Sequence, residues 1–346
     1  SSRVLLLPHI KRMKISASLY SSKDVALKDL VEELDQHKID FFHIDSRDDE
    51  SVFDDIAKIR TYSSTPIDLH LISANPEKYF DRINELKVDH VTLQFEDLNG
   101  YEYTGGLNSD MGLSIVSNTP ISALEGQFEH YDFILFMATT PGESGGQFDK
   151  INFRKIREFR KMFPGKSIHV DGGVNDEVSF ILRNMGVRVS VVGSYLFRDQ
   201  SVGAALLNLK THEIDSHFQV ADFMRTRTEI PLLNRSQRGV KDGLQSIEEH
   251  KLGFTILEDE QNQLEGIVSN ADLRRELLAH VDNPSDITVE SMINRNPISV
   301  NETSTVEDML KQIRQFTFPI NYLPVVDSNN RVTGVVSFLN LVKGEL

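Results

Sequence analysis

Four side chains of metal-binding type stand near the ends of strand-like segments in this chain: His43, Asp45, His70 and Asp171. His43 and Asp45 are two residues apart, so they share one face of the strand predicted for residues 40–45. A charged aspartate that points into an apolar interior is costly unless it is paired or bound to a metal. Two imidazoles and two carboxylates suit a divalent ion such as Zn, Fe(II), Mn or Co and leave room for substrate oxygens. Each histidine alone is more often a core or solvent-edge residue, so the predicted metal site depends on all four together.

Glycine-rich turns follow three of the later strand-like segments, at residues 140–148, 171–174 and 193–194. Backbone amides in such turns, and at the N-termini of the helices that follow them, bind phosphate groups. A single glycine-rich turn commonly connects a strand to a helix, whereas three such turns after successive strands indicate a phosphate site. We therefore predict that these glycines form the other half of the site.

The composition argues against several other kinds of function. The chain has no cysteine, which excludes disulfides, thiolate metal sites and a cysteine nucleophile, and agrees with a reducing cytosol. A formal net charge of -15 argues against a nucleic-acid partner and against binding to anionic membranes. The only apolar run near the N-terminus, residues 4–7, is too short for a signal peptide or a membrane-spanning helix. We therefore expect a cytoplasmic protein.

Strand-like and helix-like segments alternate from residue 14 to about residue 210. The eight predicted strands are 14–19, 40–45, 67–72, 89–95, 112–117, 132–138, 167–171 and 189–194. Amphipathic helical patterns lie between most of them, for example at residues 24–37 and 153–163, which is typical of parallel strands joined by helical crossovers. We predict an α/β fold, a (β/α)8 TIM barrel, with a glycine-rich loop in place of the fourth helix. Function in such barrels lies at the C-terminal ends of the strands.

An internal repeat follows the predicted barrel. Residues 252–277 and 321–344 each contain an apolar strand, an acidic turn, a second strand that begins with glycine, and a helix. Together these features divide the chain into four predicted parts: an N-terminal extension (1–13), the barrel (14–210), a connector (211–227) and an α+β pair of repeats (228–346).

The barrel segment resembles the ribulose-phosphate 3-epimerase family. The resemblance covers residues 14–210 and is carried by KISASL, FHID, DLHLISANPEKY, GLSIVSNTP, PGESGGQF, VDGGV and VVGSYLF. It implies that His43, Asp45, His70 and Asp171 bind the metal, and that Asp45 and Asp171 also transfer protons. It further implies that a sugar phosphate contacts Ser18, Met137, Gly145, Gly146, Gly172, Gly173, Gly193 and Ser194.

The implied reaction inverts a carbinol carbon beside a ketone. A single carboxylate cannot reach both faces of that carbon, whereas two can, one as base and one as acid, while the metal stabilises the charge of the developing enediolate. The loop after the second strand is short, and Gln94 stands where the family commonly has histidine, so the substrate need not be ribulose 5-phosphate. Two alternatives stay open: an epimerase for another sugar phosphate, for instance in surface-polysaccharide biosynthesis, and a catalytically inactive scaffold or sensor. A decarboxylating barrel is disfavoured, because the lysine of its Asp-x-Lys-x-x-Asp motif is missing here and Arg47 is a poor proton donor.

Residues 228–346 resemble a tandem pair of CBS domains, which are regulatory modules that bind adenine nucleotides or related ligands. The segment GIVSNADLRR (266–275) carries the resemblance, with Ser269 and Asp272 as the implied ribose and phosphate contacts. In the second repeat Ser337 persists, but Asn340 replaces the aspartate and would bind a ribose hydroxyl more weakly. The resemblance thus implies at most one good site for an adenine nucleotide or nucleotide-sugar. Assembly of a homo-oligomer is the alternative role.

Overall fold

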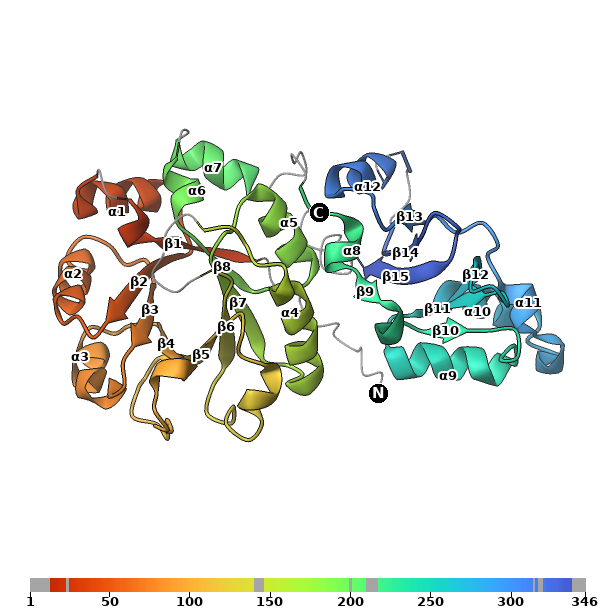
Figure 1. Cartoon of the computed structure of the whole chain (residues 1–346), viewed down its shortest axis with the longest axis horizontal. Coiled ribbons are helices and arrows are strands. Elements are labelled where there is room, and N and C mark those ends of the chain that lie inside the picture. Colours follow the sequence, from red (N-terminus) through yellow and green to blue (C-terminus); the bar gives the residue numbers. More distant parts are fainter. Residues whose placement is uncertain are drawn as a thin grey trace. The chain divides into compact units, whose positions relative to one another are not determined.

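The computed structural model describes residues 13–22, 25–139, 146–198, 201–209, 217–313, 315–316 and 320–337. These residues form two compact units, the first ending at residue 209 and the second beginning at residue 217. The strands of the first unit close into a ring, and those of the second form two smaller sheets (Figure 1). Within the described ranges, every helix is too short or too polar to cross a membrane.

The first unit is an eight-stranded parallel barrel that closes between its first and last strands. The strands follow one another in sequence order: β1 (Lys14–Ser18), β2 (Phe41–Arg47), β3 (Ile67–Ile72), β4 (His90–Gln94), β5 (Asp110–Val116), β6 (Phe133–Met137), β7 (Ser167–Asp171) and β8 (Val189–Val192). Each predicted strand is confirmed to within two residues at either end. Strands buried on both faces need apolar residues almost throughout. The buried polar exceptions include His43 and His70, but also residues such as Ser114 and His169.

Helices surround the barrel between most of its strands. They are α1 (Leu27–Gln36), α2 (Ser51–Arg60), α3 (Phe80–Glu85), α4 (Ile151–Met162), α5 (Asp176–Asn184), α6 (Ser194–Phe197) and α7 (Val202–Asn208), with 3-10 turns η1 (Leu19–Ser21), η2 (Pro76–Tyr79), η3 (Phe95–Asp97) and η4 (Ile121–Leu124). The fourth crossover has no α-helix, as predicted from its glycines. In α4, the fully buried Phe153, Ile156 and Phe159 are three residues apart and form one apolar face. Phe159 packs edge-on against Phe136 of β6, with ring centroids 6.0 Å apart.

The second unit consists of two small sheets with helices. Its strands are β9 (Arg225–Thr226), β10 (Leu232–Leu233), β11 (Phe254–Glu258), β12 (Leu264–Ser269), β13 (Val300–Asn301), β14 (Tyr322–Val326) and β15 (Val332–Ser337). Its helices and 3-10 turns are α8 (Val220–Phe223), η5 (Arg227–Glu229), α9 (Val240–His250), α10 (Asn270–Ala279), η6 (Pro284–Asp286), α11 (Val289–Met292) and α12 (Val306–Ile313). The strand orders are β10-β11-β12 and β13-β14-β15-β9.

The internal repeat appears as two matching antiparallel hairpins, β11–β12 and β14–β15. Their turn residues Asn262 and Asn330 have the same left-handed conformation, each with a φ of 61°. The carbonyl of each asparagine accepts a backbone hydrogen bond from the opposite hairpin, at 3.0 and 2.8 Å. The rings of Phe254 and Tyr322, which open the equivalent strands, stack with centroids 3.9 Å apart. Equivalent residues therefore contact each other, as expected for repeats related by approximate two-fold symmetry.

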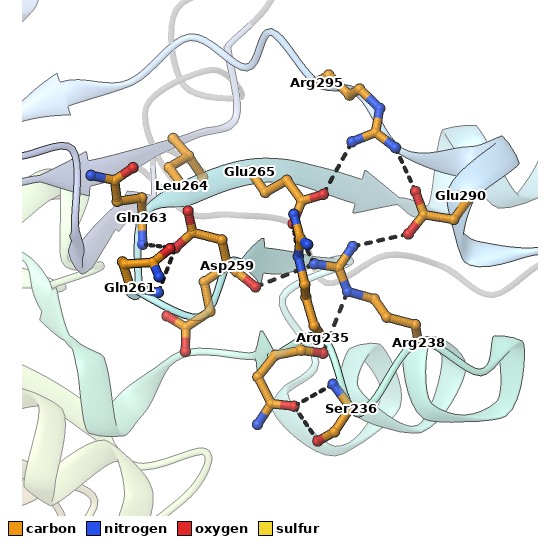
Figure 2. Close-up of polar contacts among 12 residues, drawn as sticks. Arg235, Ser236, Arg238, Asp259, Gln261, Gln263, Leu264, Glu265, Glu290 and Arg295 are labelled. Carbon is orange, nitrogen blue, oxygen red and sulfur yellow. Dashed lines mark hydrogen bonds and ion pairs between the residues drawn. The ribbon is translucent and has the colours of Figure 1, made fainter.

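A ring of ion pairs joins three segments of the second unit (Figure 2). Arg238 lies 2.6 Å from Glu265 and 3.1 Å from Glu290. Arg295 closes the ring, at 3.1 Å from Glu265 and in contact with Glu290 through its second terminal nitrogen. Hydrogen bonding from Arg238 is the main reason that the pKa of Glu265 is lowered. The ring holds the segment ahead of α9 against β12 and α11.

Candidate metal centre

The four predicted ligands meet at the C-terminal end of the barrel. One ligand atom from each of His43, Asp45, His70 and Asp171 lies within 4.8 Å of the other three. Because β7 is not a neighbour of β2 or β3, these side chains meet inside the ring of strands. His43 Nε2 is 3.4 Å from Asp45 Oδ1 and 3.8 Å from Asp171 Oδ2. His70 Nδ1 is 3.0 Å from Asp45 Oδ1.

Asp68 contacts the ring of His43 at Nδ1, the ring nitrogen that does not face the cluster. Its Oδ2 is 2.9 Å from His43 Nδ1 and accepts a hydrogen bond from Ser16 Oγ at 2.8 Å. A carboxylate only accepts hydrogen bonds, so a neutral His43 carries its proton on Nδ1 and turns a bare Nε2 toward the cluster. Asp68 is not among the site residues predicted from the sequence. A signal was present, however, because Asp68 precedes His70 by two residues and therefore shares its face of the strand.

The two carboxyl groups of the cluster differ in their ionisation. Burial opposes the ionisation of Asp45, but the positive charge of His43 and the close contacts with the His43 and His70 rings outweigh it and hold the pKa of Asp45 well below its usual range. Burial raises the pKa of Asp171 to about 6, and the nearby charge of Asp45 acts in the same direction. Burial lowers the pKa of His43, yet the attraction of Asp68 and Asp45 prevails and raises it well above the usual value.

The donor set fits a divalent cation. Histidines that bind metals almost always donate their second N–H to an acceptor, which orients the ring. Both histidines have such a partner: Asp68 for His43, and Gln94, whose Oε1 lies 2.8 Å from His70 Nε2. Two bare imidazole nitrogens and two carboxylates are typical of sites for zinc and similar ions. The cluster is therefore consistent with a metal site.

Most of the predicted substrate-binding residues lie at ends of barrel strands or in the turns that follow: Ser18, Met137, Gly146, Gly172, Gly173, Gly193 and Ser194. Gly145 lies outside the described residues. Ser18 Oγ accepts a hydrogen bond from Ser21 Oγ at 3.0 Å. Met137 is buried next to Leu135 and Val191 and provides an apolar wall inside the barrel.

Close packing explains two of these glycines. Gly172 has a φ of 106°, and a Cβ on it would lie 2.4 Å from Thr139 Oγ1. Gly173 has a φ of 64°, and a Cβ there would lie 2.2 Å from the backbone nitrogen of Phe148. Residues with a side chain rarely adopt such φ values, and no Cβ fits at these distances. The turn after β7 therefore lies directly against backbone and side-chain atoms of the segments that follow β6.

In the second unit, Ser269 and Asp272 form the cap of α10. Ser269 Oγ donates to Asp272 Oδ2 at 2.6 Å, and the Asp272 amide donates back to Ser269 Oγ at 3.3 Å. The other carboxylate oxygen of Asp272 is 3.1 Å from Arg275, whose side chain is 72% exposed. A ligand would therefore compete with an exposed arginine for this oxygen. Ser337 ends β15, and Asn340 lies outside the described residues.

Known proteins resemble both parts of the chain. The model of the ribulose-phosphate 3-epimerase family matches residues 14–197, and that of the CBS domain matches residues 289–345. The ribulose-phosphate 3-epimerases of Aquifex aeolicus, Bacillus subtilis and Methanocaldococcus jannaschii are 28%, 26% and 27% identical to this chain, in that order. The three matches cover 50%, 54% and 59% of this chain. They cover 84%, 92% and 92% of the respective relatives. Among solved structures, CBSX2 in complex with AMP is 26% identical, with a TM-score of 0.31; the match covers 37% of this chain and 95% of that one.

Proposed function

Because the chain belongs to the ribulose-phosphate 3-epimerase family and carries a C-terminal CBS domain, we propose that its barrel is a metal-dependent isomerase that epimerises a ketose phosphate. The observation that carries the proposal is the meeting of His43, Asp45, His70 and Asp171 within 4.8 Å at the mouth of the barrel. In this proposal residues 14–210 perform the reaction and residues 228–346 regulate it. Of the predicted connector, 211–227, the described residues from 217 onward belong to the second unit, where β9 pairs with β15.

The proposed mechanism uses two carboxylates on different walls of the barrel. Asp45 extends from β2 and Asp171 from β7, so one can remove the proton from carbon 3 of the sugar and the other can return a proton to the opposite face. A divalent cation held by the four side chains would supply positive charge beside the oxygens on which negative charge develops. Met137 would exclude water from one side of the sugar. The turns that contain Gly146, Gly173 and Gly193 would offer backbone amides to the phosphate.

Solvent deuterium exchange into ketose phosphates tests this proposal. The protein is stripped of metal, reloaded with Zn, Mn, Fe(II) or Co, and incubated in D2O with a panel of pentulose and hexulose phosphates. Deuterium should enter at carbon 3 of at least one sugar, only with metal present, and the epimer should appear. Asp45→Asn and Asp171→Asn should each reduce the rate by at least about 10²-fold, the usual scale for a lost acid or base. Asp110→Asn, at the opposite end of the barrel and with a side chain 74% exposed, is the matched control.

Two outcomes would count against the epimerase. If the folded, metal-loaded protein introduces deuterium into none of the sugar phosphates in the panel, a catalytically inactive scaffold becomes the better interpretation of the barrel. If exchange persists at the same rate in Asp171→Asn, proton transfer does not use the proposed pair.

We propose that the CBS pair senses an adenine nucleotide, with Ser269 and Asp272 at the ribose and phosphate. The support is the GIVSNADLRR segment and the position of Asp272, whose second oxygen is held only by the exposed Arg275 among the contacts of the described residues. Thermal shift with AMP, ADP, ATP and other nucleotides tests this, because a ligand stabilises the state that it binds. Asp272→Asn should lose the shift, whereas the exposed Asp282→Asn should keep it. If no nucleotide shifts the thermal transition but the apparent molecular mass of the protein rises with its concentration, assembly of a homo-oligomer is the better interpretation of the CBS pair.

A further inference from the structure

A chain of hydrogen bonds leads from His70 to the last residue of β5 and the turn that follows it. Oε1 of Gln94 lies 2.8 Å from His70 Nε2, and Gln94 Nε2 donates to Glu96 Oε2. The other oxygen of Glu96 accepts from the Val116 amide at 3.0 Å and from the Thr119 hydroxyl. Gln94 is only 1% exposed, whereas Glu96 is exposed, so the chain connects the buried cluster with the surface.

Glu96 decides which end of the Gln94 amide faces His70. An amide side chain has an oxygen that accepts and an NH2 group that donates, and alone it can turn either end toward an imidazole. The carboxylate of Glu96 only accepts, so it takes the NH2 group and leaves the oxygen to His70. A neutral His70 must then carry its proton on Nε2. Its Nδ1, which is 3.0 Å from Asp45, is left bare on the side of the cluster.

We propose that Glu96, acting through Gln94, is a positioning residue that holds His70 in the tautomer that binds metal. The proposal rests on the proposed metal site, but not on epimerisation or on the identity of the sugar. His43 needs no such relay, because the carboxylate of Asp68 contacts its ring directly. Without Glu96 the amide of Gln94 can turn over, and His70 can place its proton on Nδ1. That proton would bond to Asp45, and a cation would have to displace it.

A double-mutant cycle on zinc affinity tests the relay. Affinity is measured by competition with a chelator in the full-length wild type, Glu96→Gln, Gln94→Leu and the double variant. Loss of a partner that orients a metal ligand typically weakens binding by about 10–100-fold, so each single variant should fall near the lower end of that range. In the Gln94→Leu background, Glu96→Gln should cost nothing further, because the connection is already broken. If Glu96→Gln costs the same factor in both backgrounds, Glu96 acts by charge alone and the proposal fails.

Nitrogen-15 NMR of histidine gives a second readout that needs neither metal nor sugar. In metal-free wild type, at a pH at which titration of the same signals shows the His70 ring to be neutral, His70 should carry its proton on Nε2. Glu96→Gln should shift its ring signals toward a mixture of tautomers, and those of His43 should not change. A proton on Nδ1 in the wild type, or an unchanged tautomer in Glu96→Gln, overturns the proposal. The wild-type spectrum is decisive even if a variant fails to fold. It also remains so if the exchange assay finds no activity, and this separates the two proposals.

Discussion

Replacing Gly173 with alanine should destabilise the barrel much more than the same change at Gly126. The two glycines have similar backbone conformations, with φ values of 64° and 77°. A Cβ at Gly126 would meet nothing within 4 Å, whereas one at Gly173 would lie 2.2 Å from the Phe148 backbone nitrogen. Phe148 is 7% exposed, and its ring centroid is 4.7 Å from that of Phe153 in α4, so the blocking backbone cannot move away freely.

The expected magnitudes follow from these two effects. A side chain in the left-handed region costs about 1–2 kcal/mol, and this is the whole effect expected for Gly126→Ala. Forcing an extra carbon into a packed site adds about 1–3 kcal/mol. Gly173→Ala should therefore cost about 2–5 kcal/mol. It should also raise KM for a ketose phosphate, because the turn after β7 is part of the proposed phosphate site.

Hydrogen exchange in urea is the appropriate assay, because the chain contains two compact units that need not unfold together. Peptides from β6 and β7 report on the barrel alone, and peptides from β11 and β12 serve as an internal reference that should not change. The deuterium exchange assay with sugar gives KM for the same variants. Equal losses of stability in Gly173→Ala and Gly126→Ala would refute the reasoning, since only the close approach to Phe148 distinguishes the two sites.

Three further predictions concern charged groups. Asp171→Asn should stabilise the metal-free barrel by up to about 3 kcal/mol at about pH 8 and should have no such effect below about pH 4, because the pKa of Asp171 is about 6 in the folded state and lower in the unfolded state, so that its ionisation at high pH costs stability. Urea denaturation at both pH values measures this difference, and no gain in stability at the higher pH would contradict the prediction. Zinc affinity of the wild type should fall as the pH drops through about 6, because protons compete for Asp171; calorimetric titration that shows no pH dependence would count against this carboxyl as a ligand. Glu265→Gln should destabilise the second unit by about 1 kcal/mol, and by less at high salt; the difference from wild type should disappear as the pH falls below the lowered pKa of Glu265 and the wild-type carboxylate is protonated. Denaturation of the exposed Glu249→Gln variant is the control, and an equal loss of stability in both variants would exclude the ion-pair ring as the cause.

The sequence determined the architecture and the ligand types because both depend on local patterns. Alternating strand and helix signals imply parallel strands with crossovers, and eight such strands close into a barrel. The period of two placed His43 and Asp45 on one face, and the position of Asp171 at a strand end placed it near the same opening. The family resemblance added their roles. The repeat after the barrel was likewise readable, since its two copies share turn residues and strand order.

Tertiary structure alone decided which neighbours orient these ligands. Periodicity says which face of a strand points inward, but not which residues on adjacent strands stand opposite one another. That register follows from the stagger of the closed barrel, which sets His43 beside Asp68 and Asp45 beside His70. The Gln94–Glu96 relay depends in addition on where the end of β5 and the turn after it bring the amide of Val116 and the hydroxyl of Thr119. Contacts between residues twenty or more positions apart carry no local signature, so only the folded barrel shows them.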